Sequence, residues 1–270
     1  MTVDPLVTDS VTLLPPEAAG RVVVAGSHGG VYSARLALAA GVAAILLNDA
    51  GIGLDEAGVA GLVLLQRAGV PGACIGHGSA RIGDGADMLA RGRISRLNDD
   101  AARLGLREGM TAEDAVGGFA AAELVIPSAI GQDADALPFR DGPLRVYDSA
   151  SEVEAADFGT IVITGSHGGL PGPSDAAAIK TEVRIAAFND AGVGIDEAGI
   201  SRLPALDRRG IAGVTVDAFT ARIGEGRSTL ETGIISRSNR AASALGAKIG
   251  KPLADLVSRL VDTEERSHDA

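Results

Sequence analysis

Short runs of aliphatic and β-branched residues recur along the chain, and each ends in a glycine-containing or polar segment. Continuous apolar runs of this length are typical of strands that are buried on both faces of a parallel sheet. They predict strands at residues 21–25, 43–47, 72–76, 160–164, 184–188 and 213–217. Because helix-forming segments lie between these runs, we expect an α/β fold with small, mostly parallel sheets that are flanked by helices.

The helices follow from the segments between the strands. The pattern predicts them at residues 33–40, 56–68, 86–91 and 99–104, near Thr111 onward, and at 175–180 in the second part of the chain. Asp55 and Asp196 stand where an N-cap belongs, each followed by a glutamate in the first turn. Asn98 is a natural N-cap as well, and Gly69 matches the glycine that often follows a helix.

The pattern of strands and helices occurs twice because the motifs of the sequence are themselves repeated. The segment GSHGG at residues 26–30 returns 139 positions later, and NDAGIGLDEAG at residues 48–58 returns 141 positions later as NDAGVGIDEAG. A tandem duplication with two pseudo-symmetric halves explains this repetition. We place the halves and the segments between and after them by residue number: a first repeat at 1–116, a connector at 117–145 with an additional strand at 123–130, a second repeat at 146–260 and a polar tail at 261–270.

The GSHGG segments are the first candidate site. Each lies at the carboxyl end of a predicted strand and just before a helix, which is where ligands bind in parallel α/β sheets. Glycines there expose backbone N–H groups to an anion, and a histidine can act as acid or base. The candidate catalytic residues are His28 and His167. The candidate substrate-binding residues of these segments are Ser27, Gly29, Gly30, Ser166, Gly168 and Gly169.

The NDAG segments and a repeated arginine are the second candidate site. Asp49 and Asp190 are expected to orient the histidines or bind a metal, and Asn48 and Asn189 to stabilise a developing oxyanion. The same four residues are also good turn formers, which is the structural alternative. Arg81 and Arg222, in the repeated ARIG segment, are suited either to clamping a substrate carboxylate or to pairing with a nearby aspartate.

Composition narrows the class of partner. The net charge of -11 and the absence of tryptophan argue against binding to nucleic acid or to an anionic membrane surface. A single cysteine excludes an intrachain disulfide and a thiolate metal cluster. The chain has no 18-residue apolar run and does not begin like a signal peptide, so we expect a cytoplasmic protein.

Taken together, these features favour an enzyme with hydrolase or lyase-type acid/base chemistry on a small, polar metabolite, which we expect to be anionic. A cofactor-independent racemase or epimerase with two symmetric histidine bases is the first alternative. A non-catalytic anion-binding or regulatory module is the second, and a purely structural role for the motifs is the third. We expect no organic cofactor, allow for a divalent metal held by the paired His and Asp residues, and allow for a homo-oligomer. Whether His28 and His167 share one site decides between a composite pocket and two independent ones.

Overall fold

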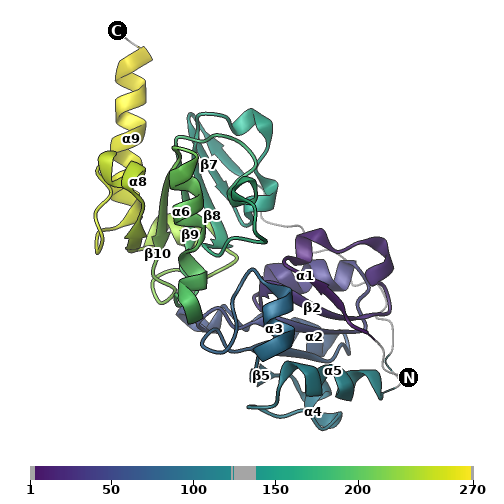
Figure 1. The fold of residues 1–270 in the computed structure, drawn as a ribbon. Helices are drawn as coiled ribbons and strands as arrows, with labels where there is room; N and C mark the ends of the chain where they lie inside the picture. The colour runs from purple at the N-terminus through teal and green to yellow at the C-terminus, as the bar shows by residue number, and fades with distance from the viewer. Residues whose placement is uncertain (1–3, 123, 125–137, 269–270) are drawn as a thin grey trace.

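The computed structural model describes residues 4–122, 124 and 138–268. The first half holds a five-stranded sheet, and the second half holds a six-stranded sheet (Figure 1). The strands and α-helices of the first half are β1 (Leu6–Thr8), β2 (Val22–His28), α1 (Val31–Ala39), β3 (Ala44–Asn48), α2 (Gly61–Arg67), β4 (Gly72–Ile75), α3 (Gly85–Arg91), β5 (Ile94–Leu97), α4 (Asp99–Arg103) and α5 (Ala112–Ala120). Those of the second half are β6 (Phe139–Asp141), β7 (Leu144–Tyr147), β8 (Ile161–His167), β9 (Ile185–Asn189), α6 (Arg202–Arg208), β10 (Ala212–Val216), α7 (Gly226–Thr232), β11 (Ile235–Ser238), α8 (Arg240–Ala244) and α9 (Leu253–His268).

The two sheets share one topology. In the first, β1 to β4 are parallel neighbours in chain order, and β5 adds to β4 in the antiparallel sense. In the second, β7 to β10 are parallel, with antiparallel β6 and β11 at the two edges. The registers also match, since His28 lies beside Asn48 and His167 lies beside Asn189. The predicted α/β class with mostly parallel sheets is confirmed.

Helices cover both faces of each sheet, which explains the unbroken apolar runs of the central strands. In the first half, Val23 and Ile45 pack toward α1 and α2, whereas Val24 and Leu46 pack toward α3, α4 and α5. All seven residues of β2 and all seven of β8 are buried. Side chains that alternate between two covered faces must all be apolar or hydrogen-bonded, and this is the pattern that the sequence displays.

Several predicted local features are confirmed. Asn98 caps α4 by accepting a hydrogen bond from the Ala101 N–H, and Thr111 caps α5 through the Asp114 N–H. Gly69 follows α2 with a φ of 69°, which is the left-handed conformation that favours glycine at this position.

Three local predictions are wrong. Asp55 and Asp196 are not N-caps; both have positive φ and lie in 3-10 helices, Leu54–Glu56 and Ile195–Ile200, so α2 begins only at Gly61. The helix expected at 175–180 is a 3-10 turn, Asp175–Ala178. Strands β2 and β8 run through the serine and histidine of GSHGG rather than ending before them. The strand expected at 123–130 lies outside the described residues apart from Leu124.

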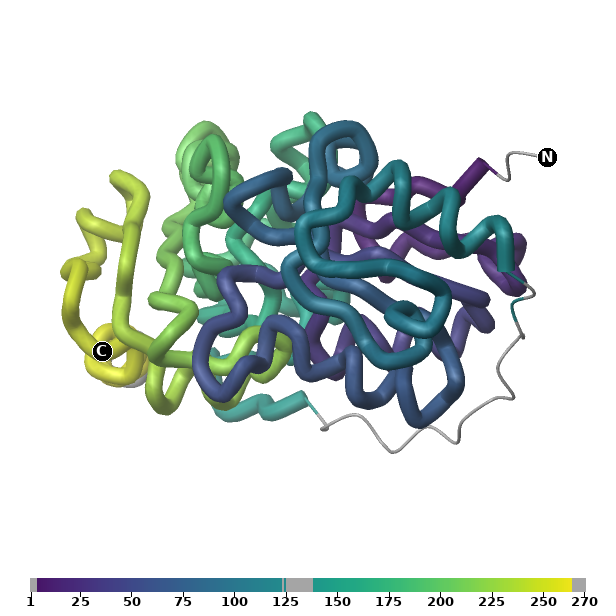
Figure 2. The backbone as a smooth tube through the Cα atoms, turned by 90° about the horizontal axis from the view of Figure 1, so that it is seen from below, coloured from purple at the N-terminus to yellow at the C-terminus, as the bar shows by residue number. Residues whose placement is uncertain are grey.

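The halves pack directly against each other. A small apolar cluster joins them, with Ala50, Ala57 and Ile82 from the first half and Ala191, Ala198 and Ile223 from the second. Figures 1 and 2 place the N-terminus and the projecting helix α9 at opposite ends of the molecule. Among the described residues, no helix is long and apolar enough to cross a membrane.

Candidate functional site

The two GSHGG segments open into one cavity between the halves. The cavity has a volume of about 240 Å³, and both His28 and His167 line it. Gly224, from the second half, lies so close to His28 that a Cβ there would be 3.0 Å from the imidazole Cε1. The geometry answers the question that the sequence left open: the two histidines line a single cavity.

The polar lining of this cavity is largely built from matching residues of the two halves. Four pairs, each separated by 139 positions, contribute hydroxyl or imidazole groups: Ser10 and Ser149, Thr12 and Ser151, Ser27 and Ser166, His28 and His167. The second half adds two cations, Lys180 and Arg202. Within the part of the chain that the structure describes, no aspartate or glutamate lines the cavity. The site is rich in hydrogen-bond donors and carries positive charge.

Ser27 and Ser166 hold the hydroxyl-bearing turns in place. Ser27 Oγ accepts the Val11 N–H at 3.0 Å, and Ser166 Oγ accepts the Ala150 N–H at 2.9 Å. These bonds fix two short 3-10 helices, Val11–Leu13 and Ala150–Glu152, against the ends of β2 and β8. Both serines are therefore structural supports as well as lining residues.

His28 has a defined set of neighbours. Its Nδ1 accepts the Gly30 N–H at 3.1 Å, which leaves the ring proton on Nε2, 3.5 Å from Ser33 Oγ. The side chain is only 4 % exposed. Because burial disfavours the charged imidazolium, the pKa of His28 falls to about 4. The ring is therefore neutral near pH 7, with an N–H available to donate.

His167 is also neutral but is held less firmly. Burial lowers the pKa of His167 well below its ordinary value, and the positive charge of Arg202 lowers it further. Its Nδ1 is buried, and no group among the described residues meets it with hydrogen-bond geometry, although the Gly169 N–H lies on that side of the ring. A buried nitrogen in this condition can accept a hydrogen bond from a ligand.

The glycines beside the histidines allow close packing. A Cβ on Gly29 would lie 2.4 Å from the Cys74 Sγ, and one on Gly168 would lie 2.5 Å from the Gly199 carbonyl oxygen. A Cβ on Gly30 would lie 2.8 Å from His28 Nδ1, and one on Gly169 would lie 2.9 Å from His167 Nδ1. These four glycines let the strand ends approach the adjoining loops and bring a backbone N–H up to each imidazole.

The asparagines of the NDAG segments do not line the cavity. Asn48 Oδ1 accepts the Ala50 N–H at 2.9 Å, and its Nδ2 donates to the Ala80 carbonyl at 3.4 Å. Asn189 repeats both bonds with Ala191 and Ala221. These bonds close the turn after each strand and tie it to the next loop.

The aspartates of the same segments also face their own loops. Asp49 Oδ1 accepts the Gly51 and His77 N–H groups and lies 2.8 Å from His77 Nδ1. Asp190 Oδ1 accepts the Gly192 and Ala218 N–H groups. Burial alone would raise the pKa of Asp49, but the hydrogen bonds from His77 outweigh it and the pKa is lowered. Asp190 has Ala218 in place of His77, and burial raises its pKa. Neither aspartate makes a hydrogen bond to His28 or His167.

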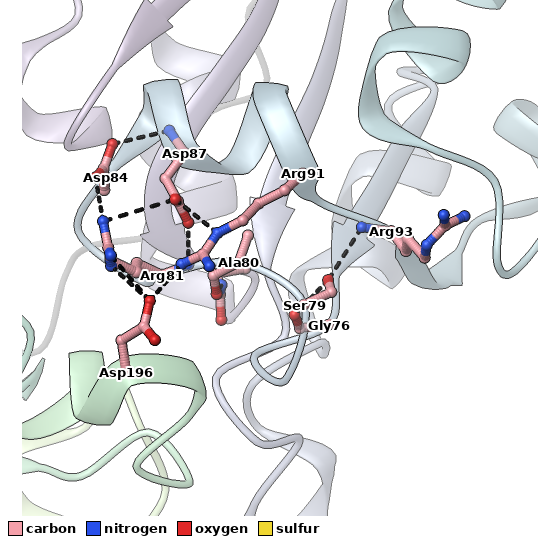
Figure 3. A network of polar contacts seen from close by, with 10 residues as sticks. Gly76, Ser79, Ala80, Arg81, Asp84, Asp87, Arg91, Arg93 and Asp196 are labelled. Atoms are coloured by element: carbon pink, nitrogen blue, oxygen red, sulfur yellow. Dashed lines mark hydrogen bonds and ion pairs between the residues drawn. The ribbon is translucent and has the colours of Figure 1, made fainter.

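Arg81 and Arg222 form ion pairs between the halves. Arg81 Nη2 lies 2.9 Å from Asp196 Oδ2, and Arg91 joins the same oxygen at 2.7 Å (Figure 3). Arg222 pairs with Asp55 in the matching way. The two arginines therefore lie at the junction of the halves. Their partners are Asp196 and Asp55, the two aspartates that the sequence predicted as helix N-caps.

Two cavity residues that carry charge, Arg202 and Lys180, were not expected from the sequence. Arg202 stands opposite Gly61 in the repeat, and Lys180 lies in a segment that diverges between the copies. A signal for the hydroxyl groups was present, since Asp9-Ser10 returns as Asp148-Ser149 at the same 139-residue shift as GSHGG.

Among the described residues, no group of three or more His, Cys, Asp or Glu side chains is placed to hold a metal ion.

No protein-family model, no curated protein sequence and no solved structure matches this chain. Its function is therefore inferred from the chemistry of the cavity.

Proposed function

We propose that this protein binds a small, oxygen-rich anionic metabolite in the cavity between its halves and uses His28 and His167 for acid–base chemistry on it. One observation carries the proposal. Two histidines from separate halves line a single cavity together with serine and threonine hydroxyls and two cations, and no described carboxylate lines it. Hydroxyl and imidazole groups match the oxygens of such a ligand, and the cations match its charge.

The electrostatics support an anion. The chain as a whole carries a net charge of -11, so a lining that holds Arg202 and Lys180 and no described acid is the reverse of the protein's average. Arg202 is only 5 % exposed, and among the described residues no carboxylate pairs with it. A buried cation without a counter-charge is unfavourable, and a bound anion would relieve that penalty.

The histidines suit proton transfer without a metal or an organic cofactor in the scheme. His28 is neutral and presents an Nε2–H that can donate a hydrogen bond to a developing oxyanion. Burial and the charge of Arg202 keep His167 in the unprotonated form that a general base requires, and its Nδ1 has no hydrogen-bond partner among the described residues. This division favours hydrolase or lyase-type chemistry. Two imidazoles from opposite halves in one cavity also suit an isomerase that uses one base on each side of a carbon.

The first experiment measures thermal stabilisation by a panel of small hydroxy and oxo acids, followed by NMR detection of turnover of any ligand that stabilises the protein. A bound ligand at 100 times its Kd raises the unfolding free energy by about 2.7 kcal/mol. We expect Lys180→Ala to weaken binding of such a ligand at least tenfold. Lys248→Ala is the matched control, because it removes the same charge from a site that is not part of the cavity.

The histidine variants test the catalytic part. We expect His28→Ala and His167→Ala each to lower turnover by roughly 10²- to 10⁴-fold while the protein remains folded. Wild-type turnover in both variants would refute the acid–base assignment. Stabilisation by a ligand that is never converted would favour the binding module instead.

A further inference from the structure

The cavity has a symmetric centre and asymmetric ends. Its four matched pairs of hydroxyl and imidazole groups come equally from both halves, but the walls beyond them differ. In the first half, helix α1 (Val31–Ala39) follows the GSHGG segment and packs against the start of α2. In the second half, the matching segment has no α-helix; it passes through a Pro-Gly-Pro stretch to the 3-10 helix Asp175–Ala178.

Arg202 occupies the room that α1 fills in the first half. Its backbone position matches that of Gly61: Gly61 N–H donates to the Gly29 carbonyl at 2.9 Å, and Arg202 N–H donates to the Gly168 carbonyl at 2.8 Å. A Cβ on Gly61 would lie 2.6 Å from two carbonyl oxygens and 2.8 Å from the Ala34 Cβ of α1. The first half therefore excludes any side chain where the second half places a guanidinium.

The guanidinium is held by the cavity wall and leaves one nitrogen uncommitted. Arg202 Nε donates to the Gly169 carbonyl at 2.9 Å, and Nη1 donates to the carbonyls of Ala177 and Ala178. The group also stacks on the Phe188 ring, 4.9 Å from its centroid. Among the described residues, Nη2 has no hydrogen-bond partner, and the nearby Asp175 is bound by Arg208 instead. Since burial lowers the pKa of Arg202 only to about 10, the group stays charged near pH 7.

The other cation of the lining belongs to the same half. Lys180 follows the 3-10 helix and donates to the Ser151 carbonyl. The residues that the first half adds to the lining beyond the matched pairs are uncharged: Val11, Leu13, Tyr32 and Ser33. Both cations of the lining thus come from the second half, where the charge of Arg202 is close enough to His167 to lower its pKa, and the lining residues of the first half are uncharged.

We propose that the ligand carries a single anionic group, which binds at Arg202 and Lys180, and a neutral, hydroxyl-bearing remainder that extends toward the first half. This inference rests on the proposed function, because it concerns the same cavity. The class that fits is a small polyhydroxy monocarboxylate. A dicarboxylate with a charge at each end would place one carboxylate against the neutral wall, where no cation compensates its lost hydration.

Three four-carbon probes of one configuration test the direction of binding: threitol, threonate and tartrate, with zero, one and two terminal carboxylates. We expect threonate to bind the wild-type protein at least tenfold more tightly than either of the others, measured by calorimetry. Arg202→Gln should reduce threonate binding to the level of threitol and leave threitol binding unchanged. Circular dichroism and the melting temperature check that the variant is folded.

If Arg202→Gln does not fold, Lys180→Ala replaces it as the test variant, because Lys180 is exposed, and Lys248→Ala is its control. We then expect a loss of threonate affinity in Lys180→Ala and none in Lys248→Ala. Tartrate binding as tightly as threonate would overturn the single-anion inference and leave the proposed function standing. Unchanged threonate binding in Arg202→Gln would also overturn the single-anion inference. If Arg202→Gln does not fold, unchanged threonate binding in Lys180→Ala would do so. No binding of any of the three probes to the wild-type protein would overturn both proposals.

Discussion

His28 and His167 occupy matching positions but have different neighbours. The Nδ1 of the first accepts the Gly30 N–H, and its Nε2 lies 3.5 Å from Ser33 Oγ. The Nδ1 of the second has no hydrogen-bond partner in the part of the chain that the structure describes, and Gly172 stands at the position that matches Ser33. Burial lowers the pKa of both histidines. Because the pKa values differ between the folded and unfolded states, the free energy of unfolding depends on pH.

The buried histidines predict a loss of stability in mild acid. His28 has a pKa of about 4 when folded, against about 6.5 in an unfolded chain, so the unfolded state binds its proton first. Its contribution is complete above pH 6.5 and falls as the pH drops toward 4, by about 3 kcal/mol in total. Urea denaturation at several pH values should show this loss, and His28→Gln should reduce its slope.

His77 provides the control for that experiment. The hydrogen bond to Asp49 raises the pKa of His77, so its contribution is present below pH 6.5 and is lost as the pH rises through the folded pKa. His77→Ala should therefore leave the acid-side loss in place. An acid-side slope that is the same in the wild-type protein and in His28→Gln would show that His28 does not titrate as its burial indicates.

At the scale of elements, the two NDAG loops hold every non-glycine residue with positive φ that the structure describes. Four consecutive residues, 50–53, have positive φ, and residues 191–194 repeat this, including the β-branched Ile52 and Val193. Each non-glycine residue among them costs about 1–2 kcal/mol relative to ordinary backbone. The asparagine and aspartate bonds described above hold these turns, which meet across the halves at Gly51 and Gly192.

Gly51 should tolerate no side chain. Its φ is 75°, and a Cβ there would lie 2.8 Å from the Gly192 Cα in the other half. We expect Gly51→Ala to lower the free energy of unfolding by more than about 2 kcal/mol, since strain and a backbone clash combine. Gly69→Ala separates these causes because Gly69 has a φ of 69° and open space around it. Equal losses in the two variants, measured by urea denaturation, would show that the contact between the halves is not tight.

At the scale of the whole molecule, apolar contacts and ion pairs both join the halves, and we expect them to contribute very differently to the free energy of unfolding. Leu54 N–H donates to the Ala218 carbonyl and Ile195 N–H to the His77 carbonyl, around the buried apolar cluster. The Arg81–Asp196 and Arg222–Asp55 pairs lie on the surface around this cluster, where water and salt screen them. The cavity depends on this junction, because each half supplies only part of its lining.

We therefore expect the apolar cluster to dominate the stability of the junction. Ile82→Ala, at a side chain that is only 4 % exposed, should lower the free energy of unfolding by about 2–4 kcal/mol. Asp55→Asn combined with Asp196→Asn should have a smaller effect that decreases with added salt. A larger, salt-sensitive loss in the aspartate double variant than in Ile82→Ala, measured by urea denaturation, would reverse this ranking.

The sequence alone determined the features that depend on neighbours within one strand or turn. Continuous apolar runs predicted the central strands, because a strand covered on both faces has no polar side. Asn98 and Thr111 were placed correctly as expected helix starts, because a cap is satisfied by backbone N–H groups three residues ahead. The repeated motifs marked the positions at which both halves meet the same structural demand.

Only the tertiary structure decided which repeated motif lines the cavity and which joins the halves. The GSHGG histidines converge on one cavity, whereas the NDAG loops meet each other at the junction, and both outcomes depend on contacts between residues more than 100 positions apart. Asp55 was predicted as a cap because its local pattern fits one, but its partner is Arg222 in the other half. Arg202 was overlooked for the same reason: a lone arginine in a helix is ordinary until the loss of α1 from the second half gives its side chain a place in the cavity wall.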